Sequence, residues 1–533
     1  MKNKLILGVI VVVIVIGGIV ALQQTGTDSK VMIGTFSTDI SGLTEAEVSE
    51  TVELKNGDSY DLTASVVKKR IGNAEVKMLA YNGSIPGPLI KVPQGAEITI
   101  NFKNETDVPT TLHSHGVRLQ NQFDGVPDVT QQEVPVGGSF TYKIRFDDTG
   151  MFWYHPHVRE DYAQESGLYG NYLVTPKDPS YWSPVDREVA LFLDDVLIEN
   201  GALAPFDTKM VNRTLMGRFG NVMLINGETN YSLQVKKGEV VRFYATNAAN
   251  ARPFNFAING TRMKLVGNDS GGYEKDQWTD AVFIGPSERA VVEVFFDKAG
   301  TYALESKTPD KSYTLGKVTV SAEPVSSANP VLFSTLKTRK EVMRSMDLLR
   351  PYFAREPDKR LSLSLEMSAE MQNMVGGAMS GMGGMAGMEN MPAAASSLPE
   401  GGIEWEEGDS AMMNSMSTAE NVKWNMIDEA TGKKNMDINW KFARGIPVKI
   451  RITNDAKSMH PMQHPIHFHG QRFLVINKNG IAQTNLAWED TFTIPAGEYA
   501  DIVLDTSNPG TWLAHCHIPE HMEAGMMMKF EVQ

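Results

Sequence analysis

Beyond residue 50 the chain is built from short stretches in which apolar and polar residues alternate. In residues 97–102 and 140–146 every second side chain is apolar or aromatic, the period of a β-strand with one buried face. Gly, Pro, Asn and Asp interrupt such stretches about every 8–12 residues, a spacing typical of β-sandwiches. The pattern therefore predicts an all-β fold made of β-sandwich domains.

One sequence pattern occurs three times, beginning at Pro135, Pro286 and Pro495. Each copy has a proline, an alternating strand, an acidic residue and then a glycine before an aromatic residue. A repeat of this kind indicates related structural units. We place the three units at residues 50–178, 181–325 and 326–533.

The N-terminus carries a membrane-directed segment. Lys2 and Lys4 precede the 18 uncharged residues 5–22, and about 20 such residues cross a bilayer as a helix. We expect residues 1–24 to be a membrane anchor or a cleaved signal, which leaves both possibilities open. The basic end stays inside, so the rest is expected to be exported to the periplasm or the extracytoplasmic face of the membrane. The polar residues 25–49 then form a tether.

Charge and cysteine content exclude several functions. The chain of 533 residues has a net charge of −14, which disfavours a nucleic-acid groove because such a groove needs an excess of Lys and Arg. Cys516 is the single cysteine, so the chain has no internal disulfide and lacks the ligands of a Cys-based zinc or iron–sulfur site.

Histidine is sparse but strongly clustered. With 11 His in the chain, chance would give about 0.2 H-x-H triplets, and four occur. The two histidines of a triplet point to the same side of a strand, so each triplet can hold neighbouring metal ions. The eight residues are His113, His115, His155, His157, His467, His469, His515 and His517.

The middle copy of the repeat has lost these ligands. Phe254 and Phe256 stand where the other units have histidines, and Glu305 corresponds to His155 and His515. We therefore expect units one and three to hold metal at their interface, with unit two as a spacer.

A second constellation surrounds the cysteine. Cys516 lies between two cluster histidines, and His521 and Met526 follow it closely; His464 lies just before the third triplet. Two His, one Cys and a weak axial Met are the ligands of a blue-copper electron-transfer centre. The chain itself would then connect this copper to the histidine cluster.

The motifs HSHG, HPH, HPIHFHG and HCHIPEHMEAGM, in this order, resemble the copper-binding motifs of three-domain multicopper oxidases. The resemblance covers about residues 75–533. It implies three cupredoxin-like Greek-key domains and four copper ions that pass electrons from a reducing substrate to O₂, which becomes water. It assigns the ligands as follows: His464, Cys516, His521 and Met526 to type 1 copper; His113 and His467 to type 2; His115, His155, His157, His469, His515 and His517 to the type 3 pair.

Reduction of O₂ also requires protons. Asp124 matches an aspartate of bacterial family members, so the resemblance gives it a catalytic role beside that of Cys516. Those members also carry Glu directly after the last type 1 histidine, where this chain has Met522. Either Glu523 replaces that acid or protons arrive by another route.

Methionine is concentrated in one insertion, at about residues 367–416. Eight Met lie in the 25 residues 367–391, interleaved with small residues, and thioethers prefer Cu(I). The insertion resembles the Met-rich segment of periplasmic cuprous oxidases and is expected to bind additional Cu(I). Met367 and Met462 match substrate-copper ligands of those enzymes; His460 stands where they have an aspartate and is otherwise most simply a surface residue.

The sequence thus predicts a multicopper oxidase that converts Cu(I) to Cu(II) with O₂ in copper tolerance. Two alternatives remain open at this point. One is a laccase-like oxidase of phenols or of Fe(II) or Mn(II); the other is a copper storage or carrier protein.

Overall fold

A computed structural model of the chain describes residues 34–327, 329–372 and 398–533. These residues form mainly β-strands, and the helices are short and lie in connections. The two strands expected at 97–102 and 140–146 appear as β5 (Glu97–Glu105) and β7 (Ser139–Arg145). The all-β prediction is confirmed.

The strands group into three successive pairs of sheets. In the first unit, sheet β3-β2-β5-β7 faces sheet β1-β4-β9-β8-β6. The remaining strands of this unit are β1 (Thr51–Glu53), β2 (Ser59–Ile71), β3 (Ala74–Tyr81), β4 (Leu89–Pro93), β6 (His113–His115), β8 (Gly150–His155) and β9 (Gly170–Thr175), and helix α2 (Glu160–Ala163) lies between β8 and β9.

The second unit pairs a six-stranded sheet, β13-β10-β15-β20-β17-β18, with the five-stranded sheet β14-β22-β21-β16-β19. Its strands are β10 (Arg187–Val196), β13 (Val222–Ile225), β14 (Tyr231–Lys237), β15 (Val240–Asn247), β16 (Phe254–Ile258), β17 (Met263–Asn268), β18 (Gly271–Thr279), β19 (Val282–Ile284), β20 (Arg289–Phe295), β21 (Gly300–Lys307) and β22 (Ser312–Pro324). A small hairpin of β11 (Ile198–Glu199) and β12 (Ala202–Leu203) projects from it.

The third unit has the same plan, with sheets β24-β23-β26-β31-β28-β29 and β25-β33-β32-β27-β30. Its elements are β23 (Lys359–Met367), α6 (Ala411–Met416), β24 (Val422–Asp428), β25 (Asn439–Phe442), β26 (Val448–Asn454), β27 (His464–Phe468), β28 (Arg472–Lys478), β29 (Ile481–Ala482), β30 (Thr491–Ile494), β31 (Tyr499–Asp505), β32 (Gly510–Cys516), α7 (Pro519–Glu523) and β33 (Met527–Val532).

The three copies of the sequence repeat adopt the same local structure. Each forms a strand and then, after a turn, a second strand: β7 and β8, β20 and β21, β31 and β32. The shared glycine begins the second strand in every copy, at Gly150, Gly300 and Gly510, with φ of 140°, 152° and 146°. Glycine adopts such positive φ angles without steric cost, which explains why this residue recurs in the repeat.

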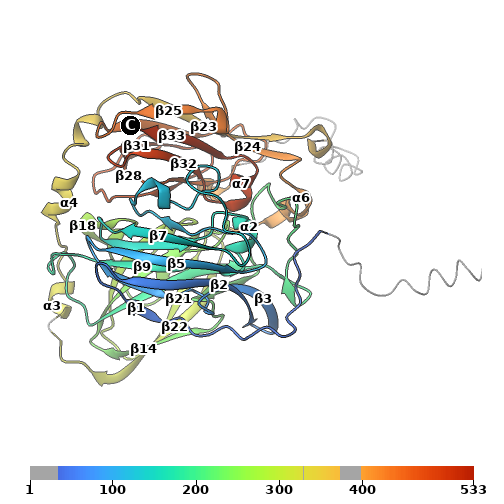
Figure 1. Cartoon of the computed structure of the whole chain (residues 1–533). Coiled ribbons are helices and arrows are strands. Elements are labelled where there is room, and N and C mark those ends of the chain that lie inside the picture. Colours follow the sequence, from blue (N-terminus) through green and yellow to red (C-terminus); the bar gives the residue numbers. More distant parts are fainter. Residues whose placement is uncertain (1–33, 328, 373–397) are drawn as a thin grey trace, which may run out of the picture.

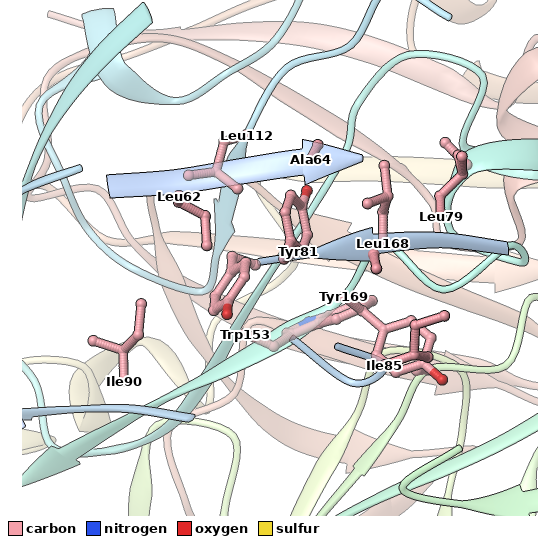
Figure 2. Packing of buried hydrophobic residues seen from close by; sticks show 14 of the residues in the cluster. Leu62, Ala64, Leu79, Tyr81, Ile85, Ile90, Leu112, Trp153, Leu168 and Tyr169 are labelled. Atoms are coloured by element: carbon pink, nitrogen blue, oxygen red, sulfur yellow. The ribbon is translucent and has the colours of Figure 1, made fainter. Parts of the chain in front are cut away.

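Each pair of sheets encloses its own apolar core. In the first unit the fully buried side chains include Tyr81, Leu112 and Trp153, which Figure 2 shows pointing into the space between the strands. Burial of each large apolar side chain contributes about 1.5–3 kcal/mol relative to exposure, so these cores fix the sheets that carry the functional residues.

The third unit lies against the first, and its strands are drawn in orange and red above the blue and teal strands of the first unit (Figure 1). The segment that contains α3 (Asn329–Phe333) and α4 (Lys340–Ser345) runs along one side of the molecule and joins the second unit to the third. Val342 and Met346 of this segment are buried against Leu474 and Val503 of the third unit.

Residues 34–49 are not the free tether that the sequence suggests. Phe36 stacks on Tyr162 with ring centres 3.8 Å apart, and Glu45 and Glu47 form β-bridges with the first unit. An aromatic side chain and backbone pairing thus dock this polar segment, which composition alone does not reveal. The expected membrane segment, residues 1–24, lies outside the described residues, and no helix among the described ones is long and apolar enough to span a membrane.

Candidate metal centre

Each outer unit places its two H-x-H triplets on, or at the ends of, neighbouring antiparallel strands; His157, His469 and His517 directly follow the last residues of their strands or lie two residues beyond. β6 pairs with β8 so that His113 lies opposite His155, and β27 pairs with β32 so that His467 lies opposite His515. The second histidine of each triplet faces the same way as the first because side chains alternate along a strand. Each unit therefore presents four imidazoles on one face.

The eight imidazoles meet where the first unit contacts the third. The ring centres of His113 and His469 are 4.1 Å apart, and those of His115 and His467 are 3.8 Å apart. The most exposed member of the group, His157, is 6% exposed. The structure thus brings together all eight histidines that the triplet spacing singles out.

Backbone carbonyl oxygens fix the orientation of several of these rings. The Nδ1 atoms of His113 and His467 bond to carbonyl oxygens of two aspartates at 2.7 and 2.8 Å. His155 and His515 make the same bond, at 2.8 Å, to the carbonyl oxygen of the next residue, Pro156 and Cys516 respectively. A ring that donates from Nδ1 keeps a lone pair on Nε2, and this nitrogen is then free to bind a metal.

The other ring nitrogens converge. His469 Nε2 lies 2.9 Å from His515 Nε2 and 3.3 Å from His157 Nε2. Four further buried ring nitrogens of the cluster have no hydrogen-bond partner: His113 Nε2, His115 Nδ1, His467 Nε2 and His517 Nδ1. Burial holds the pKa of His469 well below its usual range, so this ring is neutral. Converging lone pairs of neutral imidazoles fit copper ions, for which imidazole is a preferred ligand.

The cysteine site forms beside this cluster. Cys516 Sγ lies 3.6 Å from His464 Nδ1 and 3.8 Å from His521 Nδ1, and the two nitrogens are 3.3 Å apart. Met526 is fully buried in the same apolar cluster, and its carbonyl oxygen accepts a hydrogen bond from the Cys516 N–H. The four residues expected to bind type 1 copper are therefore neighbours.

The chemistry of the thiol also favours a metal. Burial raises the pKa of the Cys516 thiol, so at neutral pH it keeps its proton unless a cation replaces it. The indole of Trp424 covers both imidazoles of the site, with ring centres 4.7 Å from His464 and 4.4 Å from His521. This apolar shell excludes water, which tunes the potential of a bound metal.

β32 connects the two sites covalently. Cys516 contacts His464 and His521 of the thiol site, whereas the rings of its two neighbours, His515 and His517, contact His469 and His155 of the histidine cluster. With metal bound at both sites, the backbone on either side of Cys516 would be a short covalent path between them.

Asp124 bridges the two outer units. Its Oδ2 atom lies 3.0 Å from His469 Nδ1, and its Oδ1 atom lies 3.3 Å from His113 Nδ1. The sequence proposes Asp124 as a proton donor, and this role stays a prediction. Asp124 thus orients one imidazole of each outer unit, His469 through its carboxylate and His113 through its backbone carbonyl at 2.7 Å.

Three residues of the site are not predicted from the sequence. Glu160 Oε1 lies 3.1 Å from His157 Nδ1, and Asp490 Oδ1 lies 3.0 Å from His115 Nε2. Arg289 of the second unit pairs with Asp490. Glu160 could have been predicted because it lies three residues after the candidate ligand His157. Asp490 and Arg289 belong to other units than His115, so the local sequence does not indicate their contacts.

The role of Glu523 as a substitute for the acid missing at Met522 stays a prediction. Met522 is buried, and burial beside Asp161 raises the pKa of Glu523 to about 7. Among the described residues, Glu160 rather than Glu523 is the carboxylate paired with His157.

His460 is not a surface residue, contrary to the simplest sequence interpretation. It is 6% exposed, and its Nε2 atom has no hydrogen-bond partner. The loop that precedes β27 carries it inward together with Met462, which is fully buried. Met367 ends β23 and packs partly buried against the core of the third unit.

Comparison with known proteins agrees with this geometry. Multicopper oxidase family models match residues 64–179, 198–322 and 408–533. A multicopper oxidase of Staphylococcus aureus is 24% identical over 89% of this chain and 88% of its own length. Copper resistance protein A of Escherichia coli is 23% identical, with 90% and 93% covered. Laccase-1 of Botryotinia fuckeliana is 25% identical, with 85% and 78% covered.

A solved structure shows the same architecture. The multicopper oxidase of Campylobacter jejuni, described as a metallo-oxidase, superimposes with a TM-score of 0.65 at 25% identity and covers 93% of this chain and 99% of its own. The prediction of cupredoxin-like domains is therefore confirmed.

Proposed function

Since this chain belongs to the multicopper oxidase family, and is therefore a copper-dependent oxidoreductase with O₂ as electron acceptor, we propose that its reducing substrate is Cu(I). The product is Cu(II), and the reaction serves copper tolerance. We further propose four copper ions: type 1 at the Cys516 site, and type 2 with the type 3 pair among the eight histidines. Bound copper supplies the one-electron carriers, and the chain supplies the path between them along β32.

A buried imidazole beside the type 1 site carries this proposal. His460 lies close enough to His464 and His521 to perturb both electrostatically, and burial lowers the pKa of His460 to about 4. It is therefore neutral at physiological pH and offers a free nitrogen. A buried nitrogen donor without a partner is costly unless something binds it, and a copper ion would do so.

Methionines of the third unit lie in the same part of the fold. Met462 follows His460 by two residues and is fully buried, and Met371 is 1% exposed. Met367 pairs with Val422 on β24, two residues before the Trp424 that covers the type 1 imidazoles. Together with the His460 imidazole, these thioethers would form a soft donor set, which favours Cu(I) over Fe(II) or Mn(II).

The methionine-rich insertion supports the same substrate through its flanks. Residues 373–397, which hold most of its methionines, lie outside the described residues. After them, Glu404 exchanges two hydrogen bonds with Gln463, from the Glu404 N–H at 2.7 Å and to the Glu404 carbonyl at 3.1 Å. Gln463 directly precedes His464, so the insertion leaves and rejoins the described fold next to the type 1 site.

Paired substitutions test the substrate. We expect Met367→Leu/Met462→Leu to lower kcat/KM for Cu(I) about tenfold or more while leaving kcat/KM for a phenol within about twofold, because only the soft donors are lost. Met263→Leu, a buried methionine of the second unit, is the matched control and should change neither value. Oxygen uptake measures turnover, and unchanged visible absorption verifies that type 1 copper is intact.

The alternatives predict other results. A laccase-like oxidase would oxidise phenols far better than Cu(I) in the unaltered protein and would lose both activities together. A storage or carrier protein would stop consuming O₂ once the supplied Cu(I) exceeded the number of bound ions.

We also propose that the chain is exported and held at the extracytoplasmic face of the membrane. Lys2, Lys4 and the uncharged residues 5–22 support this location. We expect the full chain to sediment with membranes and a chain that begins at residue 34 to remain soluble. Recovery of the full chain in the cytosolic fraction would contradict the proposal.

A further inference from the structure

The second unit, which has no copper ligands of its own, reaches the histidine cluster through one side chain. Arg289 begins β20 and is fully buried. Its Nη1 atom donates to Asp490 Oδ1 at 2.7 Å, and its Nη2 atom pairs with Asp490 Oδ2. Its Nε atom donates to the carbonyl oxygen of Met151 in the first unit at 3.1 Å. One guanidinium thus links all three units.

Asp490 in turn holds two cluster histidines. Its Oδ1 atom lies 3.0 Å from His115 Nε2, and its carbonyl oxygen lies 2.8 Å from His467 Nδ1. Thr491 Oγ1 adds contacts of 2.9 Å to His115 Nε2 and 3.1 Å to His467 Nδ1. With Nε2 of His115 occupied, its Nδ1 atom is the nitrogen left for the cluster, in contrast to His113 and His467, which leave Nε2.

Asp269 of the second unit also binds this part of the third unit. Asp269 is fully buried; it accepts the N–H of Arg289 at 2.8 Å and the N–H groups of Asp490 and Thr491 at 3.2 and 3.3 Å. Residues 490–491 therefore bind the second unit on one side and hydrogen-bond to His115 and His467 on the other.

We propose that Arg289 is a positioning residue for the copper cluster. It fixes the Asp490 carboxylate, which fixes the His115 ring in the tautomer that leaves Nδ1 free. Buried ion pairs contribute little net stability because desolvation offsets their attraction. This pair differs from other buried pairs in that its carboxylate also contacts His115. The inference depends on copper at the cluster and not on the identity of the reducing substrate.

The test separates positioning from folding. Arg289→Met/Asp490→Asn removes both members of this pair together, and Asp269, 3.5 Å from Arg289 Nη1, keeps its three backbone N–H donors. Arg289→Lys keeps the charge but loses the two-pronged contact. The matched control is Arg339→Met/Asp276→Asn. Arg339 and Asp276 form an equally buried pair, with Nη1 2.7 Å from Oδ1, away from the histidines.

Copper content and spectra are the readouts. We expect the Arg289→Met/Asp490→Asn variant to lose cluster copper to a competing chelator about 10–100-fold more readily, since loss of outer-shell partners typically weakens metal binding by this factor. Arg289→Lys should retain more copper but alter the paramagnetic resonance signal of the cluster. Visible absorption of the Cys516 copper should be unchanged in both.

The control variant should retain its copper even if its melting temperature falls. Wild-type copper retention in Arg289→Met/Asp490→Asn and an unaltered resonance signal in Arg289→Lys would overturn the proposal. Equal copper loss in the control would also overturn it, because the effect would then follow general destabilisation. None of these readouts depends on Cu(I) turnover, so failure here is distinct from failure of the proposed substrate.

Discussion

Cys516→Ser is expected to abolish the strong visible absorption of the copper-loaded protein and to lower oxygen uptake by more than about 1,000-fold, equivalent to about 4 kcal/mol in the barrier. The thiolate is the one soft anionic ligand of its site, and its backbone joins that site to His515 and His517. Serine is nearly isosteric and leaves the eight imidazoles in place. Copper at the histidine cluster should therefore persist while electrons no longer reach it.

Met526→Leu is the matched control for this substitution. It alters the same buried site but removes only the weak axial ligand of the expected set. The blue absorption should remain and turnover should change by less than about tenfold, since an axial ligand tunes the potential rather than forming the site. Near wild-type turnover by Cys516→Ser would contradict the electron path along β32.

Gly116→Ala is expected to disrupt the cluster although it removes no ligand. Gly116 has φ of +78°, and an added Cβ atom would lie 2.2 Å from Asp490 Oδ2 and 2.9 Å from Arg289 Nη2. Overpacking there displaces the carboxylate that holds His115. We expect a loss of about 3 kcal/mol or more of stability, together with depletion of cluster copper. Thermal unfolding and copper analysis provide the measurements.

Gly137→Ala isolates the contribution of backbone conformation. Gly137 has nearly the same φ, +80°, but nothing lies within 4 Å of its added Cβ atom. The alanine should cost only about 1–2 kcal/mol there and leave copper binding unchanged. If the two variants behaved alike, the close packing of Gly116 against Asp490 would have no part in holding the cluster.

The clustering of the candidate ligands could be predicted from sequence because their spacing is local. Two histidines one residue apart on a strand must share a face, and Cys516 between two of them must face the other way. The fold class followed from the same alternation. The glycines that end two of these motifs, Gly116 and Gly470, are required by close packing, which the sequence does not show. A Cβ atom at Gly470 would lie 2.2 Å from the Trp512 ring.

The surroundings of the ligands could not be predicted in this way. Asp490 and Arg289 act on His115 from two other units, and no periodicity relates positions so far apart. Burial of His460 depends on the loop before β27, and docking of residues 34–49 depends on a stack between Phe36 and Tyr162. Each of these features comes from tertiary contacts, whereas spacing reports only on neighbours in the chain.

The long sequence separation of His115 and Asp490 affects when the protein can be loaded with copper. The two residues are 375 positions apart, and β32 and α7, which carry Cys516 and His521, are among the last elements to be synthesised. A nascent chain holds the first two triplets long before their partners exist, so early copper would meet half-built sites. Complete loading must wait until the C-terminus has folded, and a truncation before β32 leaves a protein unable to mature.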